Sequence, residues 1–480
     1  DILPDSLLDF PRNIFLFVPL GFGLAAILDR RGWSRNHIRL VVLVCGFLLT
    51  LFVESQQQFL PSRQPSAADL IANTLGALVG IACFRLWQNR EATAEWLEEI
   101  LAMPGKVLAA LAIYVLLLLS IAYGLSSIVR FHDWDPDYGL MLGNEHTGDR
   151  PWLGSVRDLV IYNRALEPGE ARSLLKDPGF ALSNEGGLLA YYPLSGGSTE
   201  QDLTGKQPDL SWQPISGKES NGRTVQFDGR RWLATESAVA EISEQLQETS
   251  QLTIRLTVAT TELEQSGPAR ILTISEEPFL RNLTLGQKNN DLVVRFRSRL
   301  TGENGAAPQI LFPDIFTRSD PIDLVVTYDG LTIDLIASHS DTLESMELVP
   351  GAAFYYNYLD LIVNPNPSLS QITAGTIPNW FYQLLFYIII FLPLGILLSL
   401  RAVTAWQQEY HLILLFSGLL VIPLLLETVL VYRSGQDLRP LNVVTSVLVI
   451  GLVAWVFVPL VRQLISVRRT AHTQRVTESG

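Results

Sequence analysis

Cysteine is nearly absent from this sequence of 480 residues, which contains only two. Both, Cys45 and Cys83, lie in apolar segments that we expect to be membrane helices. The polar region at residues 130–370 has no cysteine at all. Disulfide bonds therefore do not stabilise that region, whichever compartment it occupies.

Residue patterns for several enzyme classes are also missing. His132, His146 and His339 are scattered through the polar region, and their spacing does not match a zinc site. The sequence has no glycine-rich phosphate loop, and no Ser-His-Asp or Cys-His set can be singled out. These absences argue against a zinc enzyme, a P-loop nucleotide enzyme and a hydrolase with a catalytic triad.

Basic residues are in the minority, and the net charge is −13 at pH 7. Residues 130–370 hold 34 acidic and 19 basic side chains, whereas the rest of the chain holds 14 acidic and 16 basic ones. We therefore expect an acidic insert carried by a nearly neutral apolar part. No stretch resembles a basic nucleic-acid-binding surface, so nucleic acid is not an expected partner.

Long apolar runs are what the sequence has in abundance. About 20 apolar residues in a helix cross a bilayer core, and the predicted spans are 13–28, 38–53, 70–87, 107–128, 381–400, 412–426 and 441–461. The lipid bilayer is thus the first expected partner. The predicted parts of the chain are 1–129 with four spans, the insert at 130–370, 378–462 with three spans, and a basic tail at 463–480.

Two polar motifs lie at the edges of the first apolar runs. The motifs are Asn13-x-x-Leu-Phe-x-Pro19-Leu-Gly21, and Glu54-Ser followed by Arg63, Pro-Ser, Asp69 and Asn73-Thr-x-Gly76. Charged residues at a membrane boundary are costly and are often functional. The motifs resemble the VanZ-like family of bacterial membrane proteins over about residues 10–88. That resemblance implies a helical membrane domain, and the family is linked to low-level resistance to the glycopeptide teicoplanin.

A weaker copy of this pattern follows the insert. Pro393-Leu-Gly395 matches Pro19-Leu-Gly21, and the next acidic residue, Glu427, comes 34 residues after the proline, against 35 in the first copy. Acid, base, acid and amide recur in the same order as Glu427, Arg433, Asp437 and Asn442. This self-similarity predicts an internal duplication. Because both copies run in the same direction, we expect both motif loops on the same face of the membrane.

Two interpretations of these polar residues stay open. In one, Glu54, Arg63, Asp69 and Asn73, with their counterparts in the second copy, bind a lipid-linked or cell-wall substrate. In the other, Arg63 pairs with Glu54 or Asp69, and Arg433 pairs with Glu427 or Asp437, as structural clamps of the two loops. A duplication would copy a clamp as readily as a binding site.

The insert has the composition of a β protein. Short runs rich in Val, Ile and Thr alternate with turn residues, which predicts a sandwich with strands at 156–162, 188–192, 224–227, 252–258, 271–274, 292–297 and 324–328. Residues 154–171 resemble the closing strand and turn of laminin-G-like domains, and residues 189–194, with 225–229, resemble their opening strands. The resemblance implies a concanavalin A-like β-sandwich, circularly permuted because the closing motif comes first.

Asp158, Asn163 and Asp228 are candidates for a calcium or sugar site, because related sandwiches use carboxylates and carbonyls on a rim for such ligands. For Asp228 the alternative is a simple turn, since Asp228-Gly229 is a frequent turn pair. Calcium is the one cofactor that the sequence brings into consideration.

Basic residues in short loops predict the orientation. They gather at 29–39, 85–106, 401–410 and 462–480, which places the motif loops and the insert outside the cytoplasm of a bacterial plasma membrane. The preferred function is a non-enzymatic envelope protein that binds a surface glycan or glycopeptide through the sandwich. The alternative is a membrane enzyme or transporter acting on a lipid-linked glycan, and protein partners are a further option.

Overall fold

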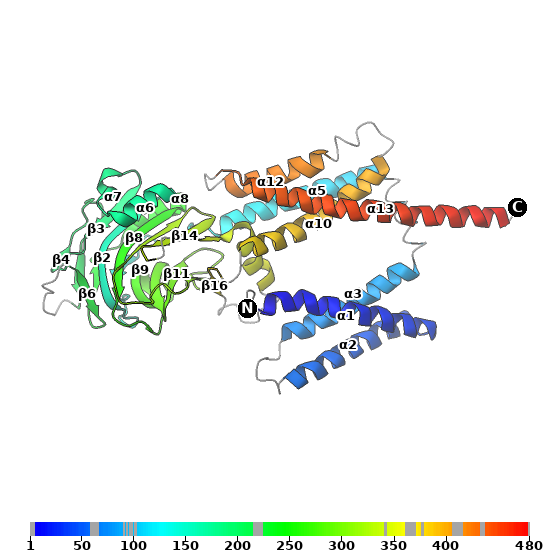
Figure 1. The fold of residues 1–480 in the computed structure, drawn as a ribbon, viewed down its shortest axis with the longest axis horizontal. Coiled ribbons are helices and arrows are strands. Elements are labelled where there is room, and N and C mark those ends of the chain that lie inside the picture. Colours follow the sequence, from blue (N-terminus) through cyan, green and yellow to red (C-terminus); the bar gives the residue numbers. More distant parts are fainter. Residues whose placement is uncertain are drawn as a thin grey trace.

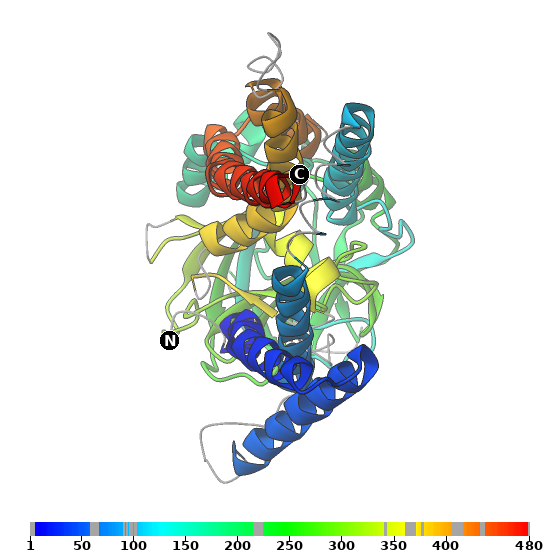
Figure 2. The same cartoon turned by 90° about the vertical axis from the view of Figure 1, so that its right-hand side faces the viewer.

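A computed structural model describes most of the chain. The described residues are 5–57, 67–89, 92, 95, 99, 103–214, 224–339, 343–360, 371–375, 379–405, 416–432 and 437–478. Figure 1 shows a β domain at one end of the molecule and two groups of helices at the other. Viewed from the helical end, the two groups are separate (Figure 2).

The N-terminal helix group contains α1 (Asp5–Arg30), α2 (Arg35–Gln57) and α3 (Ala67–Gln88). Small residues let α1 and α3 approach closely, as is common between membrane helices. A Cβ added to Gly21 of α1 would lie 2.1 Å from the carbonyl oxygen of Ala77 in α3. The group has its own apolar core, in which Ala25, Ile38 and Phe84 are buried.

The C-terminal helix group contains α5 (Pro104–Ile128), α10 (Asn379–Ala405), η4 (Ser417–Val421), α12 (Ile422–Tyr432) and α13 (Pro440–Glu478). Here α10, which contains the second Pro-Leu-Gly segment, packs on α13. A Cβ on Gly395 of α10 would lie 2.7 Å from the Val453 side chain of α13. The helix α13 continues through most of the predicted tail at 463–480.

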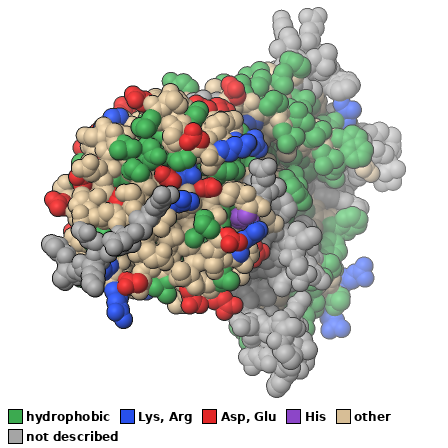
Figure 3. Space-filling view, turned by 60° about the vertical axis from the view of Figure 1, so that its left-hand side comes forward, with side chains coloured by type: hydrophobic (Ala, Val, Ile, Leu, Met, Phe, Trp, Pro, Cys, Tyr) green, Lys and Arg blue, Asp and Glu red, His purple; other side chains and the backbone are tan. Residues whose placement is uncertain are grey.

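Apolar side chains cover the outside of both helix groups. Within the described part of the chain, three helices are long and apolar enough to cross a membrane, judged by length and composition: Gly105–Ile128, Asn379–Val403 and Pro440–Gln463. A shorter apolar helix covers Ser417–Tyr432. The predicted spans 13–28, 38–53 and 70–87 coincide with α1, α2 and α3, whose crossing of the bilayer stays a prediction. Figure 3 shows hydrophobic side chains gathered over the helical part, in contrast to the mixed surface of the β domain.

The β domain, residues 139–373, contains two sheets. The nine-stranded sheet has the order β16 (Gln371–Thr373), β12 (Gln309–Phe312), β11 (Asp291–Phe296), β10 (Leu280–Lys288), β9 (Ala269–Glu277), β1 (Gly139–Leu142), β7 (Trp232–Thr235), β5 (Leu210–Gln213) and β4 (Thr199–Glu200). The seven-stranded sheet has the order β15 (Leu343–Glu347), β14 (Thr332–Ala337), β13 (Ile322–Tyr328), β8 (Leu252–Thr260), β2 (Leu153–Tyr162) and β3 (Leu188–Tyr192), with β6 (Val225–Asp228) also paired to β2.

The strands predicted from the insert all fall within or overlap observed strands. The closing-motif strand β2 pairs antiparallel with the opening-motif strand β3, with Ile161 opposite Ala190. Three helices accompany the sheets, namely α6 (Pro168–Lys176), α7 (Phe180–Ser183) and α8 (Ala240–Thr249). The chain is thus a mixed protein of apolar helices and two β-sheets. The last strand, β16, lies just beyond the predicted insert of 130–370.

One hydrophobic core runs from the β domain into the C-terminal helix group. Buried side chains from both sheets, such as Ile254 and Leu285, belong to the same cluster as Leu125 of α5, Phe386 of α10 and Leu426 of α12. Two short π-helical turns, η1 (Leu348–Ala352) and η2 (Tyr355–Leu359), follow β15 and precede β16 and α10 in the sequence. Because this packing is continuous, the β domain and the C-terminal helices form one body (Figure 1).

Candidate functional sites

The second polar motif lies where α12 and α13 meet the β domain. Glu427 on α12 is 2 % exposed, and Asn442 on α13 is also buried. The Asn442 Nδ2 atom donates to both carboxylate oxygens of Glu427, at 3.2 Å each. The backbone N–H of Arg439, just before α13, donates to Glu427 Oε1 at 3.2 Å. The acid Glu427 and the amide Asn442 of the second motif are therefore in direct contact.

Arg439 extends this polar cluster to the β domain. Its guanidinium forms an ion pair with Glu347 at the end of β15, and its Nη2 atom donates to Thr332 Oγ1 on β14 at 3.0 Å. The side chain of Gln383 on α10 also donates to Glu347. The contacts of Glu427, Asn442, Arg439, Glu347 and Gln383 thus join three helices to the seven-stranded sheet, and we call this group the seam cluster.

Burial is the main cause of the pKa shift of Glu347 in the seam cluster. Loss of solvent raises the pKa of Glu347 to about 7, although the neighbouring Arg439 guanidinium acts in the opposite direction. Nearby carboxylates, including Glu427 and Asp329, raise it further. Glu347 therefore changes protonation near neutral pH, whereas the ordinary pKa of a glutamate is 4.5.

Sequence reasoning missed Arg439 as the contact residue. The predicted partner of Glu427 was Arg433, which lies outside the described residues, so its pairing stays a prediction. Asp437 is described and exposed. The signal for Arg439 was its position directly before Pro440, at the start of a helix, where a charged side chain can reach a neighbouring domain. Its partners on β14 and β15 are distant in the sequence and had no local signal.

The first motif is only partly described. Asn73 on α3 is 5 % exposed. Its Oδ1 atom has no hydrogen-bond partner among the described residues. The side chains of Glu54 and Asp69, and all of Arg63, lie outside the described residues, so the predicted Arg63 contact is untested. In Figure 1 the C-terminal end of α2 and the N-terminal end of α3 point to the β-domain side, as do the corresponding ends of α12 and α13.

Each predicted calcium or sugar residue of the β domain contacts other protein groups. Asp158 lies at an irregularity of β2 with a φ of 52°, and its carboxylate pairs with Arg255 at 3.5 Å. The Asn163 Nδ2 atom donates to Gln245 Oε1 at 3.0 Å. Asp228 Oδ1 accepts the backbone N–H of Arg230 at 3.0 Å, which is turn geometry. Within the described ranges, no group of three or more His, Cys, Asp or Glu side chains could hold a metal ion.

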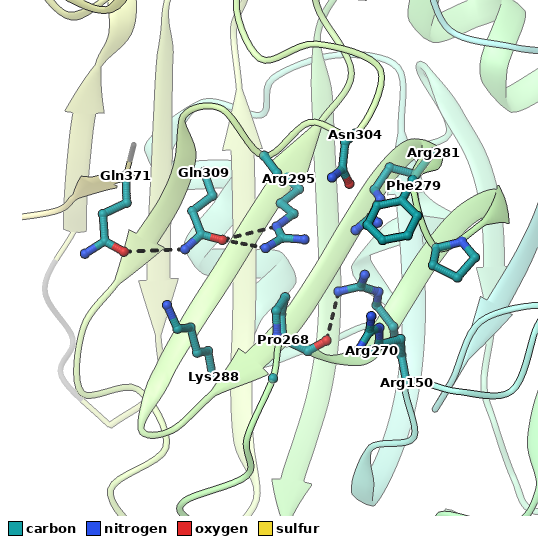
Figure 4. Close-up of a pocket in the computed structure, with 13 residues that line it drawn as sticks. Arg150, Pro268, Arg270, Phe279, Arg281, Lys288, Arg295, Asn304, Gln309 and Gln371 are labelled. Atoms are coloured by element: carbon teal, nitrogen blue, oxygen red, sulfur yellow. Dashed lines mark hydrogen bonds between the residues drawn. The ribbon is translucent and has the colours of Figure 1, made fainter. Parts of the chain in front are cut away.

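A cavity of about 570 Å³ opens on the nine-stranded sheet. Its lining contains Arg150, Gly267, Pro268, Arg270, Pro278, Phe279, Arg281, Lys288, Arg295, Asn304, Ala306, Gln309 and Gln371, and we call it the basic cavity. Val294 and Phe296 of β11 face the core, so Arg295 between them points to the opposite face. Figure 4 shows Arg281, Arg295 and Gln309 on neighbouring strands. Most of its residues lie within 267–309, but sequence reasoning missed the site, because only the pairing of β9 to β12 brings their side chains to one face of the sheet.

Comparison with protein-family models gives a match at the N-terminal end of the chain. Residues 3–88 match the family model described as VanZ/LLP1, which covers less than a fifth of the 480 residues. No curated protein and no solved structure is significantly similar to the chain. The match supports a VanZ-like domain at residues 3–88, and together with the three long apolar helices it indicates a membrane protein.

Proposed function

We propose that this protein, whose residues 3–88 form a VanZ-like domain, is a non-enzymatic envelope protein that binds a cell-surface glycan or glycopeptide through its β domain. The VanZ family is associated with membranes and linked to the envelope and to antibiotic resistance. In this proposal the helices cross the bacterial plasma membrane, the second helix group is a degenerate copy of the first, and the β domain is a laminin-G-like sandwich on the outer side.

The observation that carries the proposal is a ligand-sized cavity on a domain that is fixed to membrane helices. A volume of about 570 Å³ lies in the usual range for small-ligand sites, roughly 300–1,000 Å³. The lining combines an aromatic ring, Phe279, with the amides of Asn304, Gln309 and Gln371. Such groups suit a sugar, whose ring stacks on an aromatic face and whose hydroxyls bond to amides. The shared core of the β domain and α5, α10 and α12 would hold that ligand at a constant distance from the membrane.

Mass spectrometry of the native protein tests this function. The full chain, purified gently from membranes, is expected to carry a saccharide or glycopeptide. Ala306→Trp, which fills the cavity, should abolish its recovery. Leu203→Trp is the matched control, since Leu203 is exposed and is not part of the cavity lining. Equal recovery of the saccharide with both variants would overturn the proposal.

The alternative function is a membrane enzyme or transporter acting on a lipid-linked glycan. It is favoured by one observation at the seam cluster: the buried Tyr387 hydroxyl has no hydrogen-bond partner among the described residues, and it lies close enough to Glu427 and Glu347 to interact with both charges. A lipid-linked saccharide that is lost in Glu427→Gln but kept in Ala306→Trp would support this alternative over glycan binding by the β domain.

A further inference from the structure

The basic cavity concentrates positive charge on an acidic domain. Residues 130–370 carry 34 acidic and 19 basic side chains, yet the cavity lining holds four arginines and Lys288. None of the described lining residues is acidic. Random placement of charges on such a domain would favour carboxylates, so the lining is a local reversal of the domain's charge.

Arg281 is the least compensated of these cations. It is 1 % exposed, and its Nε and Nη1 atoms have no hydrogen-bond partner among the described residues. The pairing of β9 with β10 shifts register on both sides of Arg281, and such irregularities often re-aim a side chain beside a binding site. A buried guanidinium with free N–H groups is costly unless an acceptor satisfies it.

The surrounding charges increase this cost. Burial and the neighbouring Arg270 and Arg295 guanidiniums lower the pKa of Arg281 to about 8. Burial and the cations Arg270 and Arg150 lower the pKa of Arg295 to about 9. The ordinary pKa of arginine is 12.5, so burial, and after it the neighbouring cations, disfavour the charged form of both groups, which a bound anion would favour.

The protein itself supplies little negative charge to these groups. Glu145 is fully buried and pairs with Arg270, with 3.3 Å between Oε2 and Nε. The negative charge of Asp149 also raises the pKa of Arg270. Neither carboxylate hydrogen-bonds Arg281 in the described structure. One bound oxyanion would therefore supply acceptors and negative charge where both are missing.

Neighbouring side chains hold the site in a defined geometry. Gln309 Oε1 accepts from Arg295 Nη2 at 2.6 Å and from Nε at 3.2 Å, so the guanidinium plane of Arg295 is fixed (Figure 4). The Asn304 Oδ1 atom is buried and has no hydrogen-bond partner among the described residues, so it is available to a ligand hydroxyl. Phe279 is 64 % exposed and offers a face on which a sugar ring can stack.

We propose that the basic cavity binds an oxyanion group, a carboxylate or a phosphate, with Arg281 as its main contact and Arg270 and Arg295 beside it. Guanidinium groups bind both anions through paired N–H donors, which makes arginine the suited residue for either. This inference rests on the proposed glycan-binding function in one respect only. That function makes an acidic sugar of the cell envelope the preferred source of the oxyanion. A free phosphate ion has the same binding chemistry.

Calorimetric titration of the full-length protein in detergent tests the oxyanion site. The probes are inorganic phosphate, glucuronate and, as the neutral analogue, glucose. Glucuronate is expected to bind at least tenfold more tightly than glucose, and more weakly as salt concentration rises. Equal binding of glucose and glucuronate would overturn the oxyanion site while supporting glycan binding. Binding of phosphate without any saccharide would support the oxyanion site and overturn the glycan function.

Substitution of Arg281 separates binding from a structural role. Arg281→Gln should weaken glucuronate and phosphate binding at least tenfold, whereas Arg299→Gln, a change at an exposed residue outside the lining, should leave binding unchanged. Phosphate should raise the melting temperature of the wild type and of Arg299→Gln but not of Arg281→Gln. Without phosphate, Arg281→Gln should melt at or above the wild-type temperature, because it removes an uncompensated charge. A strongly lowered melting temperature with wild-type binding would contradict the proposal.

Discussion

The two helix groups differ in how they are attached to the β domain. In the C-terminal group, Asn442 binds Glu427, and the adjacent Arg439 connects the pair to Glu347 of the β domain. In the N-terminal group, the Asn73 oxygen is buried without a hydrogen-bond partner among the described residues. The C-terminal group shares its core with the β domain, whereas the N-terminal group has a core of its own.

This difference bears on the two interpretations of the motif. In the C-terminal group the acid and the amide satisfy each other, and the adjacent Arg439 connects them to the β domain. The clamp formed by Arg433 stays a prediction, because Arg433 lies outside the described residues. The same residue types in the N-terminal group belong to the segment that matches VanZ/LLP1. A substrate role for Glu54, Arg63, Asp69 and Asn73 stays a prediction, as does the alternative site at Glu427 beside Tyr387.

The largest effect is expected from loss of Arg439. At pH 8, where Glu347 is ionised, Arg439→Ala should destabilise the joined β domain and helices by about 3–5 kcal/mol, because it leaves buried carboxylates unpaired. The measurement is thermal unfolding in detergent. Arg299→Ala, which breaks an exposed pair with Asp133, should cost no more than about 1 kcal/mol. Wild-type stability of Arg439→Ala would show that the seam cluster is not a clamp.

A second effect concerns pH. The pKa of Glu347 is raised to about 7 in the folded protein, against an ordinary value of 4.5. Between these values the folded state holds a proton that the unfolded state has released, so stability is greatest below about pH 4.5 and falls as pH rises through about 7. The expected loss is about 3 kcal/mol, from the two and a half pKa units that separate the states. Unfolding followed from pH 5 to 8 measures it, and Glu347→Gln should flatten the profile. An unchanged profile in that variant would assign the titration to another group.

A third, smaller effect tests the independence of the N-terminal group. Gly21→Ala forces a methyl group against the Ala77 carbonyl and should destabilise this group by about 1–3 kcal/mol. Protease sensitivity of α1–α3 should rise, while ligand binding by the β domain stays unchanged. Gly23→Ala is the matched control on the same helix, because nothing lies within 4 Å of its added Cβ. A parallel loss of ligand binding would show that the two helix groups are coupled.

The last prediction concerns membrane topology and involves no change in stability. It tests whether the two predicted copies of the motif are arranged in parallel. Cys45 and Cys83 are first replaced by alanine, since both are exposed free thiols. Single cysteines at positions 62 and 435 are then labelled with a membrane-impermeant maleimide in spheroplasts. Both should react from the outside. Reaction from opposite sides would refute a parallel duplication and place only one motif loop beside the β domain.

Local patterns were sufficient to predict many elements. Apolar length predicted the helices α1, α2, α3, α5, α10 and α13, and alternation of β-branched and turn residues predicted strands such as β3 and β8. The strand β10 was missed, because it contains buried polar residues: Arg281, Asn282, Thr284 and Gln287. A run with so few apolar side chains has no hydrophobic signal, and its place in the sheet depends on hydrogen bonds to β9 and β11.

The sequence by itself determined the division into apolar helices and an acidic β domain, since solvent preference and backbone propensity act over neighbouring residues. It also placed Glu54 and Glu427 in the last turns of the helix before each motif loop, and Asn73 and Asn442 near the start of the helix that follows. Only the tertiary structure decided that Arg439 meets Glu347, and that Arg270, Arg281 and Arg295 line one cavity. These contacts join segments that are distant in the chain or lie on different strands. Strand register and domain packing bring them together, and no local pattern encodes either one.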